Sequence, residues 1–204
     1  MLAITTLSIR PSVSSRIPTQ YGSFLIKAYP YQEEGSPNLA LLTEDLEVNK
    51  PVFVRIHSEC LTGDVFGSAK CDCGEQLDYA MKWMQEYGGV VLYLRQEGRG
   101  IGLVNKLKAY NLQDEGLDTR EANLALGFHE DLRDYTSAIA ILEDLGIAQI
   151  RLLTNNPEKL QAFDDSPITV VDRVPIEMPP KTENLGYLRT KKKDMGHLLT
   201  SEVL

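Results

Sequence analysis

The chain contains three cysteines, and all of them lie in one short stretch, at Cys60, Cys71 and Cys73. Thiolate sulfur is a preferred zinc ligand, and catalytic zinc sites use three protein ligands while water or substrate takes the fourth position. An odd number of cysteines, two of them one residue apart, argues against a disulfide framework. The spacing therefore predicts a metal site with an open coordination position, which is typical of a catalytic metal.

Two other interpretations of the cysteines stay open from the sequence. His57, His129 or His197 could complete a closed structural zinc site, because the chain has no other histidine. The three thiols could instead be small buried side chains without a ligand. The flanking residues 70–75 are mostly polar, and this argues against burial.

A second candidate segment is Arg-Gln-Glu-Gly-Arg-Gly-Ile-Gly at residues 95–102. It follows an apolar run and opens a helical pattern, where main-chain N–H groups and the helix dipole favour an anion. Arg99 can bind phosphate through two donors at once. The spacing fits neither the dinucleotide fingerprint nor the phosphate loop. The segment thus indicates an anion site, although a tight structural turn would also explain its glycines.

Three further features are weaker when each is taken alone. His57 and Glu59 match the first half of the zinc deaminase signature, but its second half is missing, so a deaminase fold is not supported. Hydrolytic attack on a purine-like carbon remains a sensible reaction for such a metal. The acidic segment 130–134 is typical of a solvated helix start, and Tyr110 is typical of a core or interface residue.

Composition limits the classes of function. The net charge of −8 and the isoelectric point near 5.0 disfavour a nucleic-acid-binding surface. No apolar run reaches the length of a membrane span, and a hydrophobic fraction of 43% is sufficient for a core. Reduced cysteines acting as metal ligands indicate a cytoplasmic protein. Residues 1–15 are serine-rich and carry no acidic residue, which leaves a very short transit peptide open. The expectation for this segment is a flexible N-terminal tail.

The apolar patterns predict an α/β fold with a mixed sheet, in which a β-rich N-terminal third precedes alternating helices and strands. The first third reads as antiparallel β structure, and the cysteine segment begins where its third strand ends. Asp118 and Glu121 predict a capping box at the start of a short helix. The expected strands are 21–28, 38–43, 51–56, 90–94, 150–153 and 168–174, and the expected longer helices are 76–86, 103–113 and 135–145.

Together these segments resemble GTP cyclohydrolase II, the enzyme that opens the purine ring of GTP at the start of riboflavin biosynthesis. Four blocks carry the resemblance in order: residues 55–64, 71–74, 95–103 and 152–157. The resemblance implies a single catalytic domain at 16–199, flanked by tails at 1–15 and 200–204. It also implies the stand-alone form of the enzyme, which is not fused to a dihydroxybutanone phosphate synthase domain.

The resemblance implies that Cys60, Cys71 and Cys73 bind one zinc ion per subunit, and that a zinc-activated water attacks C8 of guanine. Formate and pyrophosphate would leave, giving a diaminopyrimidine ribosylamine phosphate. Tyr110 would act in ring opening. Asp131 matches a proton acceptor, and Arg133 matches a nucleophile that takes the guanylyl group. A guanidinium keeps its proton and has no free lone pair, so a phosphate clamp is the other role open to Arg133.

Substrate contacts are also implied. Arg55, Arg99 and Lys159 would supply positive charge for the triphosphate, together with a magnesium ion, and Gln76 or Glu97 would read the guanine edge. The resemblance further implies a homodimer that binds GTP. A non-catalytic guanine-nucleotide-binding paralogue and a variant that stops at the formamidopyrimidine remain the alternatives. The complete set of implied contacts is Arg55, Ile56, His57, Ser58, Glu59, Gln76, Glu97, Gly98, Arg99, Thr119, Thr154 and Lys159.

Overall fold

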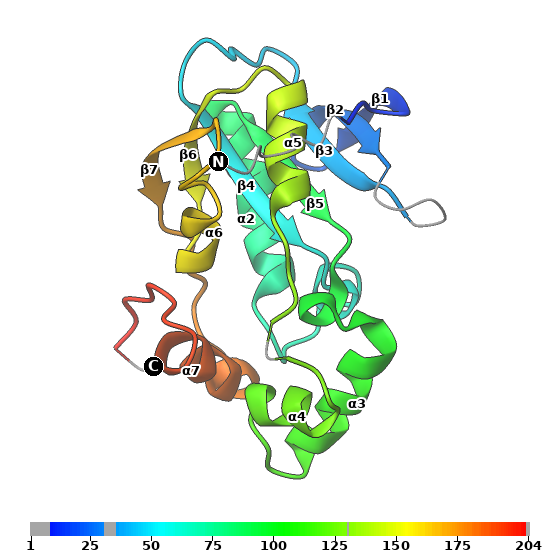
Figure 1. Cartoon of the computed structure of the whole chain (residues 1–204), viewed down its shortest axis with the longest axis vertical. Coiled ribbons are helices and arrows are strands. Elements are labelled where there is room, and N and C mark those ends of the chain that lie inside the picture. The colour runs from blue at the N-terminus through cyan, green and yellow to red at the C-terminus, as the bar shows by residue number, and fades with distance from the viewer. Residues whose placement is uncertain (1–8, 31–35, 130, 203–204) are drawn as a thin grey trace, which may run out of the picture.

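The computed structural model describes residues 9–30, 36–129 and 131–202, which form a mixed seven-stranded sheet with helices on its two faces (Figure 1). The strand order is β1-β2-β3-β5-β4-β6-β7. This confirms the predicted mixed α/β fold. The strands are β1 (Val13–Thr19), β2 (Gly22–Tyr29), β3 (Asn38–Thr43), β4 (Val52–Ser58), β5 (Val90–Leu94), β6 (Gln149–Leu153) and β7 (Thr169–Val174).

The sheet is antiparallel at one end and parallel at the other. β1, β2 and β3 form an antiparallel meander, and β3 also pairs antiparallel with β5. β4 instead pairs parallel with both β5 and β6. The expectation that residues 51–56 belong to the antiparallel part is therefore wrong. The chain crosses over through α2 (Cys73–Tyr87) between β4 and β5, and a crossover of this kind makes consecutive strands parallel.

The predicted N-terminal tail needs correction, because β1 begins at Val13. This strand is mostly exposed, so it lacks the alternation of apolar residues by which a half-buried strand is recognised. Main-chain pairing with β2 along its whole length holds it at the edge of the sheet. Residues 1–8 of the predicted tail, and residues 203–204 of the predicted C-terminal tail, lie outside the described residues.

Two helices cover opposite faces of the sheet (Figure 1). On one face, α5 (Thr136–Asp144) packs against a core that includes Val90 and Leu92 of β5. On the other face, α2 packs against a second core that includes Val91. Successive side chains of β5 thus enter different cores, which explains why its sequence is apolar without alternation.

The remaining helices gather beyond the carboxyl ends of the parallel strands (Figure 1). They are α1 (Leu61–Asp64), α3 (Gly102–Asp114), α4 (Thr119–Ala125), α6 (Pro157–Gln161) and α7 (Leu185–Lys193). The predicted capping box between Asp118 and Glu121 is present at the start of α4. None of the helices in the described ranges has the length and apolar character needed to cross a membrane. Open α/β sheets bind ligands at the carboxyl ends of their parallel strands, so this is where a site is expected.

Candidate active site

A large pocket is lined by residues at or just after the ends of β4, β5 and β6 and by residues of α3 and α7. The structure therefore brings together segments that are more than a hundred residues apart, such as Arg55 and Lys159. The predicted site residues that line the pocket are Arg55, His57, Ser58, Glu59, Cys60, Cys71, Cys73, Gln76, Glu97, Gly98, Arg99, Tyr110, Arg133, Thr154 and Lys159.

Three predicted residues are placed differently. The Ile56 side chain is fully buried in the core on the α5 side of the sheet, and only its carbonyl faces the site, where it accepts a hydrogen bond from Lys159 Nζ at 2.8 Å. Asp131 does not line the pocket but lies against Arg133. Thr119 is the first residue of α4, and its side chain is outside the described part.

The three cysteine sulfurs converge, with all Sγ atoms within 4.8 Å of one another. Cys60 and Cys71 are only 6% and 5% exposed, so the expectation that polar flanking residues keep the thiols unburied is wrong. Asp72, which lies between two of the cysteines, is itself buried and forms an ion pair with Lys191 at 2.7 Å. A partner distant in the chain thus compensates the charge of Asp72, so that this polar segment can lie in the interior.

Glycines allow the sulfurs to come so close. A Cβ atom at Gly63 would lie 2.9 Å from Cys71 Sγ and 3.2 Å from Cys60 Sγ, and one at Gly74 would lie 2.3 Å from the Gly63 carbonyl oxygen. Three converging soft ligands fit a tetrahedral metal that keeps one open position. The observed donors therefore suit the metal site that the spacing predicted.

Hydrogen bonding within the cluster separates the thiols. Hydrogen bonds from Cys71 and Cys73 lower the pKa of Cys60, and Lys106 lowers it further. The corresponding bond to Cys60 raises the pKa of Cys71 to about 11. The arrangement therefore favours a thiolate at Cys60, the protonation state in which sulfur binds metal.

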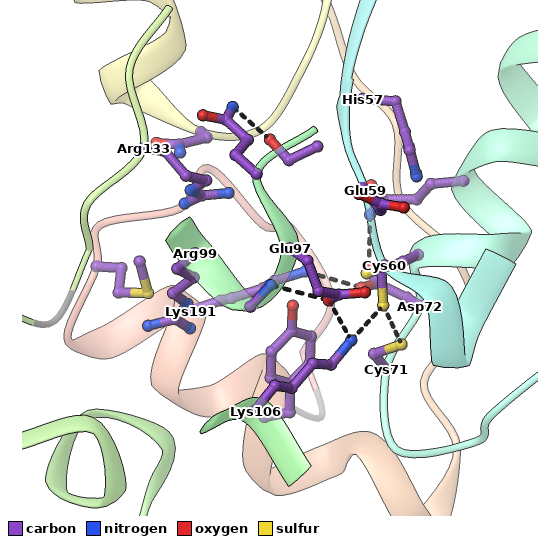
Figure 2. A pocket seen from close by; sticks show the side chains of 18 of the residues that line it. His57, Glu59, Cys60, Cys71, Asp72, Glu97, Arg99, Lys106, Arg133 and Lys191 are labelled. Carbon is purple, nitrogen blue, oxygen red and sulfur yellow. Dashed lines mark hydrogen bonds and ion pairs between the residues drawn. The ribbon is translucent and has the colours of Figure 1, made fainter. Parts of the chain in front are cut away.

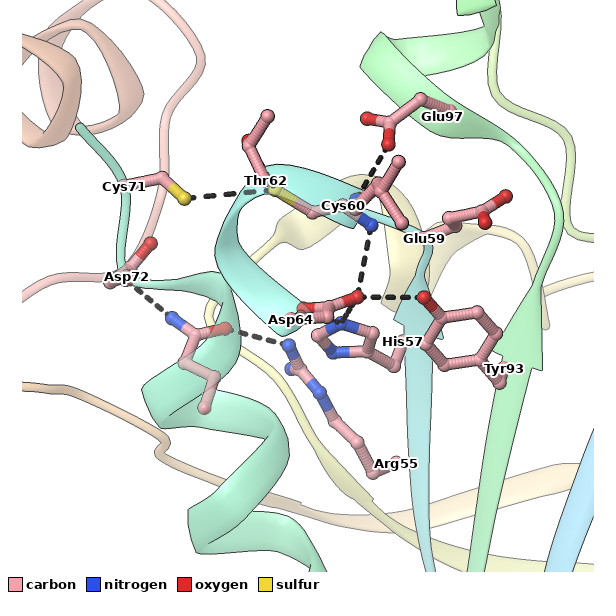
Figure 3. A network of polar contacts seen from close by, with 12 residues as sticks. Arg55, His57, Glu59, Cys60, Thr62, Asp64, Cys71, Asp72, Tyr93 and Glu97 are labelled. Carbon is pink, nitrogen blue, oxygen red and sulfur yellow. Dashed lines mark hydrogen bonds and ion pairs between the residues drawn. The ribbon is translucent and has the colours of Figure 1, made fainter. Parts of the chain in front are cut away.

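Asp64 organises the start of the cysteine segment (Figure 3). Its carboxylate accepts hydrogen bonds from His57 Nε2 at 3.0 Å, Tyr93 Oη at 2.8 Å and the Cys60 main-chain N–H at 3.0 Å. Burial lowers the pKa of His57, so the neutral ring donates through Nε2 and stacks on Tyr93. Within the described ranges, no histidine joins the metal-binding group. His57 thus helps to hold the segment that carries Cys60, through Asp64, and is not part of the thiol cluster.

Arg99 and Arg133 lie across the pocket from the cysteines (Figure 2), and Arg55 and Lys159 also line it. Burial lowers the pKa of Lys159 well below its usual value, and the nearby Arg55, Arg133 and Lys191 lower it further. Arg55 donates to the neutral acceptors Gln76 Oε1 at 2.6 Å and the Leu153 carbonyl at 3.0 Å. The charged form of Lys159 is therefore disfavoured in the protein alone, and an anion bound in the pocket would favour it again. The pocket is thus suited to an anionic ligand.

The nearby positive charge also affects the pKa of His197. Burial lowers the pKa of His197 to about 3, and Lys191, Arg133 and Lys159 contribute. Histidine in the unfolded chain has a pKa near 6.5, so below this pH the unfolded state binds a proton that folded His197 does not yet bind. The free energy of unfolding therefore decreases as the pH falls below about 6.5. We expect the free energy of unfolding of the wild type to fall more steeply from pH 6.5 to 4 than that of His197→Gln.

The difference in slope should approach about 1.4 kcal/mol per pH unit at most, and partial exposure of the ring reduces it. Urea unfolding at several pH values measures this quantity directly. His129→Gln is the matched control, because His129 is exposed and is not among the residues that line the pocket. Parallel pH profiles for wild type and His197→Gln would contradict the assignment.

Arg133 is held by Asp131. Its Nε donates to Asp131 Oδ1 at 2.9 Å, and its Nη2 contacts Oδ2. Burial alone would lower the pKa of Arg133, but the nearby Tyr135 and Asp131 outweigh this and raise it. The guanidinium is therefore a fixed, protonated donor group, which suits a phosphate clamp.

A strained turn fixes the segment that carries Arg133. Arg99 has a φ of 61°, a left-handed conformation that is rare for side chains with a Cβ atom, and its carbonyl accepts a hydrogen bond from Leu132 N at 3.0 Å. A Cβ at Gly100 would lie 3.0 Å from Leu132 Cβ. The glycine-rich turn thus packs directly against the neighbour of Arg133, and such strain often marks functional sites.

The two predicted readers of guanine are engaged by protein partners. Gln76 lies between Arg55 and Asp72, with Nε2 2.5 Å from Asp72 Oδ2. Glu97 accepts from the Leu61 main-chain N–H at 2.6 Å and from Lys106 Nζ at 2.8 Å. Both side chains line the pocket, but their polar groups hold other parts of the site.

Four other predicted residues also have specific partners. Glu59 Oε1 accepts from Arg95 Nη1 at 2.7 Å, and Ser58 Oγ accepts from Gln96 Nε2 at 3.0 Å. Thr154 Oγ1 accepts from the Asn156 main-chain N–H at 3.0 Å, and Tyr110 Oη lies 3.3 Å from Thr62 Oγ1. The pocket wall is therefore already ordered by protein contacts, which lowers the entropic cost of binding a ligand.

A family model described as GTP cyclohydrolase II matches residues 10–175. The chain belongs to the GTP cyclohydrolase II family. This membership confirms the resemblance that the four sequence blocks indicated. All of those blocks lie within the matched residues, and each contributes to the pocket.

Relatives in this family are named riboflavin biosynthesis protein RibBA. The chain is 52% identical over 192 residues to the protein from Bacillus cytotoxicus and 53% identical over 188 residues to that from Bacillus cereus. The matches cover 94% and 92% of this chain but 48% and 47% of the relatives, so the chain spans about half of their length.

Among solved structures, RibBX from A. baumannii, a two domain 3,4-dihydroxy-2-butanone 4-phosphate synthase, is similar over 86% of this chain and 42% of its own. Its TM-score is 0.46 and its sequence identity is 18%. A likeness at this level does not bear on the pocket of this chain.

Four residues of the site were missed from the sequence. Asp64 and Asp72 lie within two of the four sequence blocks, at 55–64 and 71–74, so the need to hold the cysteines in place could have pointed to them. Lys106 precedes Tyr110 by four residues on a helix, and this spacing places both on one face. Lys191 had no such signal, because only the fold brings it to Asp72.

Proposed function

We propose that the chain hydrolyses GTP, opening the imidazole ring at C8 and releasing formate and pyrophosphate. The product would be the diaminopyrimidine ribosylamine phosphate of riboflavin biosynthesis. One observation carries the proposal: a cluster of three thiols and a group of basic side chains line the same pocket. Membership of the GTP cyclohydrolase II family supports it.

The thiol side of the pocket suits the ring-opening half of the reaction. Cys60, Cys71 and Cys73 would hold zinc, which when bound supplies a water of lowered pKa as a nucleophile. Tyr110 lies beside this cluster, since its hydroxyl is 3.3 Å from Thr62 Oγ1, which is 3.8 Å from Cys60 Sγ. Burial raises the pKa of Tyr110. The phenol therefore keeps its proton and can donate it to a ring nitrogen.

The cationic side suits the triphosphate. Lys159 and Arg55 would neutralise phosphate oxygens, and Arg133 would present parallel donors held by Asp131. A magnesium ion would share the remaining negative charge. Water attacking the α-phosphate would then release pyrophosphate, with Arg133 as a clamp. The protonated state of its guanidinium supports this role over that of a covalent nucleophile.

We also infer that the active form is a cytoplasmic homodimer with one zinc ion per subunit, as the family resemblance implies. Large apolar side chains are exposed on the segment between α1 and α2 and on α3, among them Phe66 at 75% and Val104 at 67%. Contact with a second subunit would remove them from water. Light scattering combined with metal analysis measures both the subunit number and the stoichiometry.

A product assay tests the proposed function. Purified protein is supplied with zinc, GTP and magnesium, and formate, pyrophosphate and the pyrimidine product are each quantified. We expect equal amounts of all three. Pyrophosphate without formate would identify the variant that stops at the formamidopyrimidine. Binding of GTP without any product would identify a non-catalytic nucleotide-binding protein.

A further inference from the structure

Lys106 reaches into the cysteine cluster from α3 (Figure 2). Its Nζ lies 3.0 Å from Cys60 Sγ and 2.8 Å from Glu97 Oε1, and the residue is only 9% exposed. Neither the cysteine motif nor the family's implied substrate contacts includes this lysine. A buried ammonium that donates to both a sulfur and a carboxylate has a defined direction, so its position is specific.

Glu97 connects Lys106 to the main chain of the segment that carries Cys60. Its Oε1 accepts from Lys106 and from the Gly98 N–H at 2.8 Å, while its Oε2 accepts from the Leu61 N–H at 2.6 Å. The pair therefore holds Cys60 twice, at its sulfur through Lys106 and at the following peptide through Glu97. Both carboxylate oxygens take part in these contacts.

The glycine-rich turn makes this approach possible. Gly98 has a φ of 61°, and a Cβ atom there would lie 3.0 Å from Lys106 Cβ. Glycine accepts the left-handed conformation without steric cost and leaves room for the lysine stem. The turn thus serves the metal side of the pocket through Gly98 and the phosphate side through Arg99.

The positive charge of Lys106 indicates what this pair does at the cysteine cluster. Three thiolates around a divalent cation carry one net negative charge, and an ammonium that donates to one thiolate compensates it. Hydrogen bonds to metal-binding groups orient them and change the affinity for the metal. We propose that Lys106, held by Glu97, is a positioning residue that orients the Cys60 thiolate and compensates the charge of the metal site. This inference rests on the proposed zinc site.

The test compares Lys106→Met with Lys108→Met, because Lys108 lies exposed on the same helix. Zinc affinity is measured by competition with a chromophoric chelator, and the sulfur-to-metal charge-transfer band is measured in the cobalt-substituted protein. We expect Lys106→Met to weaken zinc binding by about 10- to 100-fold and to move the band to longer wavelength. Lys108→Met should match the wild type, and Lys106→Arg should recover part of the affinity.

Glu97→Gln tests the other member of the pair. The amide removes the charge that holds Lys106, so zinc affinity should fall and the cobalt charge-transfer band should move as in Lys106→Met. This variant also serves if Lys106→Met does not fold. Unchanged zinc affinity in Glu97→Gln would overturn the inference, as would an unshifted band in folded Lys106→Met. A wild type that binds no zinc would reject the proposed metal site itself.

Discussion

Replacing Cys71 with serine should remove metal binding and ring opening together. Cys71 Sγ lies 3.6 Å from Cys60 Sγ within the convergent cluster, and a serine hydroxyl is shorter, harder and protonated at neutral pH. Soft thiolates select zinc over harder cations, so loss of one of three should reduce zinc affinity and formate release by more than about 100-fold. Metal analysis after dialysis and a formate assay measure the two effects.

Affinity for a GTP analogue, which depends on the basic side chains of the pocket, is the internal control for the Cys71→Ser experiment. Lys159 and Arg55 are fixed by contacts to β4, β6 and α2, none of which involves the thiols. The variant should therefore bind a non-hydrolysable GTP analogue within about threefold of the wild type. Val65→Ala, an exposed change in the same loop, should alter neither property. Formate release by a zinc-free Cys71→Ser protein would contradict the proposed chemistry.

The metal cluster could be predicted because its members are close in the sequence. Cys60 and Cys71 are brought together by a short segment whose glycines allow close approach, and such local geometry is visible in a motif. The burial of these thiols could not be predicted in the same way. It depends on Lys191, which pairs with Asp72 across 119 residues of chain, and single-sequence patterns do not contain contacts of this range.

The fold shows the same division between local and long-range information. The strand 90–94 was found because a continuous apolar run predicts a strand buried on both faces. The parallel pairing of β4 was missed, because the direction of pairing depends on the crossover and not on the pattern within the strand. β1 was missed because its side chains are mostly exposed and its stabilisation comes from main-chain pairing with β2.

Replacing Arg133 with lysine should abolish pyrophosphate release while leaving zinc content unchanged. Lysine keeps the charge but loses the planar fork that meets Asp131 on one side and can meet phosphate on the other. Arginines that stabilise transferring phosphoryl groups contribute on the order of 10³-fold or more in rate, and we expect a loss of that size. Arg151→Lys, an exposed change on β6, is the matched control.

Asp131→Asn distinguishes the two roles open to Arg133. If Arg133 clamps phosphate, the amide still accepts a hydrogen bond and orients the guanidinium, so pyrophosphate release should fall by only about 10-fold. If Arg133 is a nucleophile, it needs Asp131 to take its proton, and the loss should equal that of Arg133→Lys. Intact-mass spectrometry of rapidly quenched wild-type reactions gives an independent answer. A guanylyl adduct on Arg133 would overturn the clamp, because a clamp forms no covalent bond to the nucleotide.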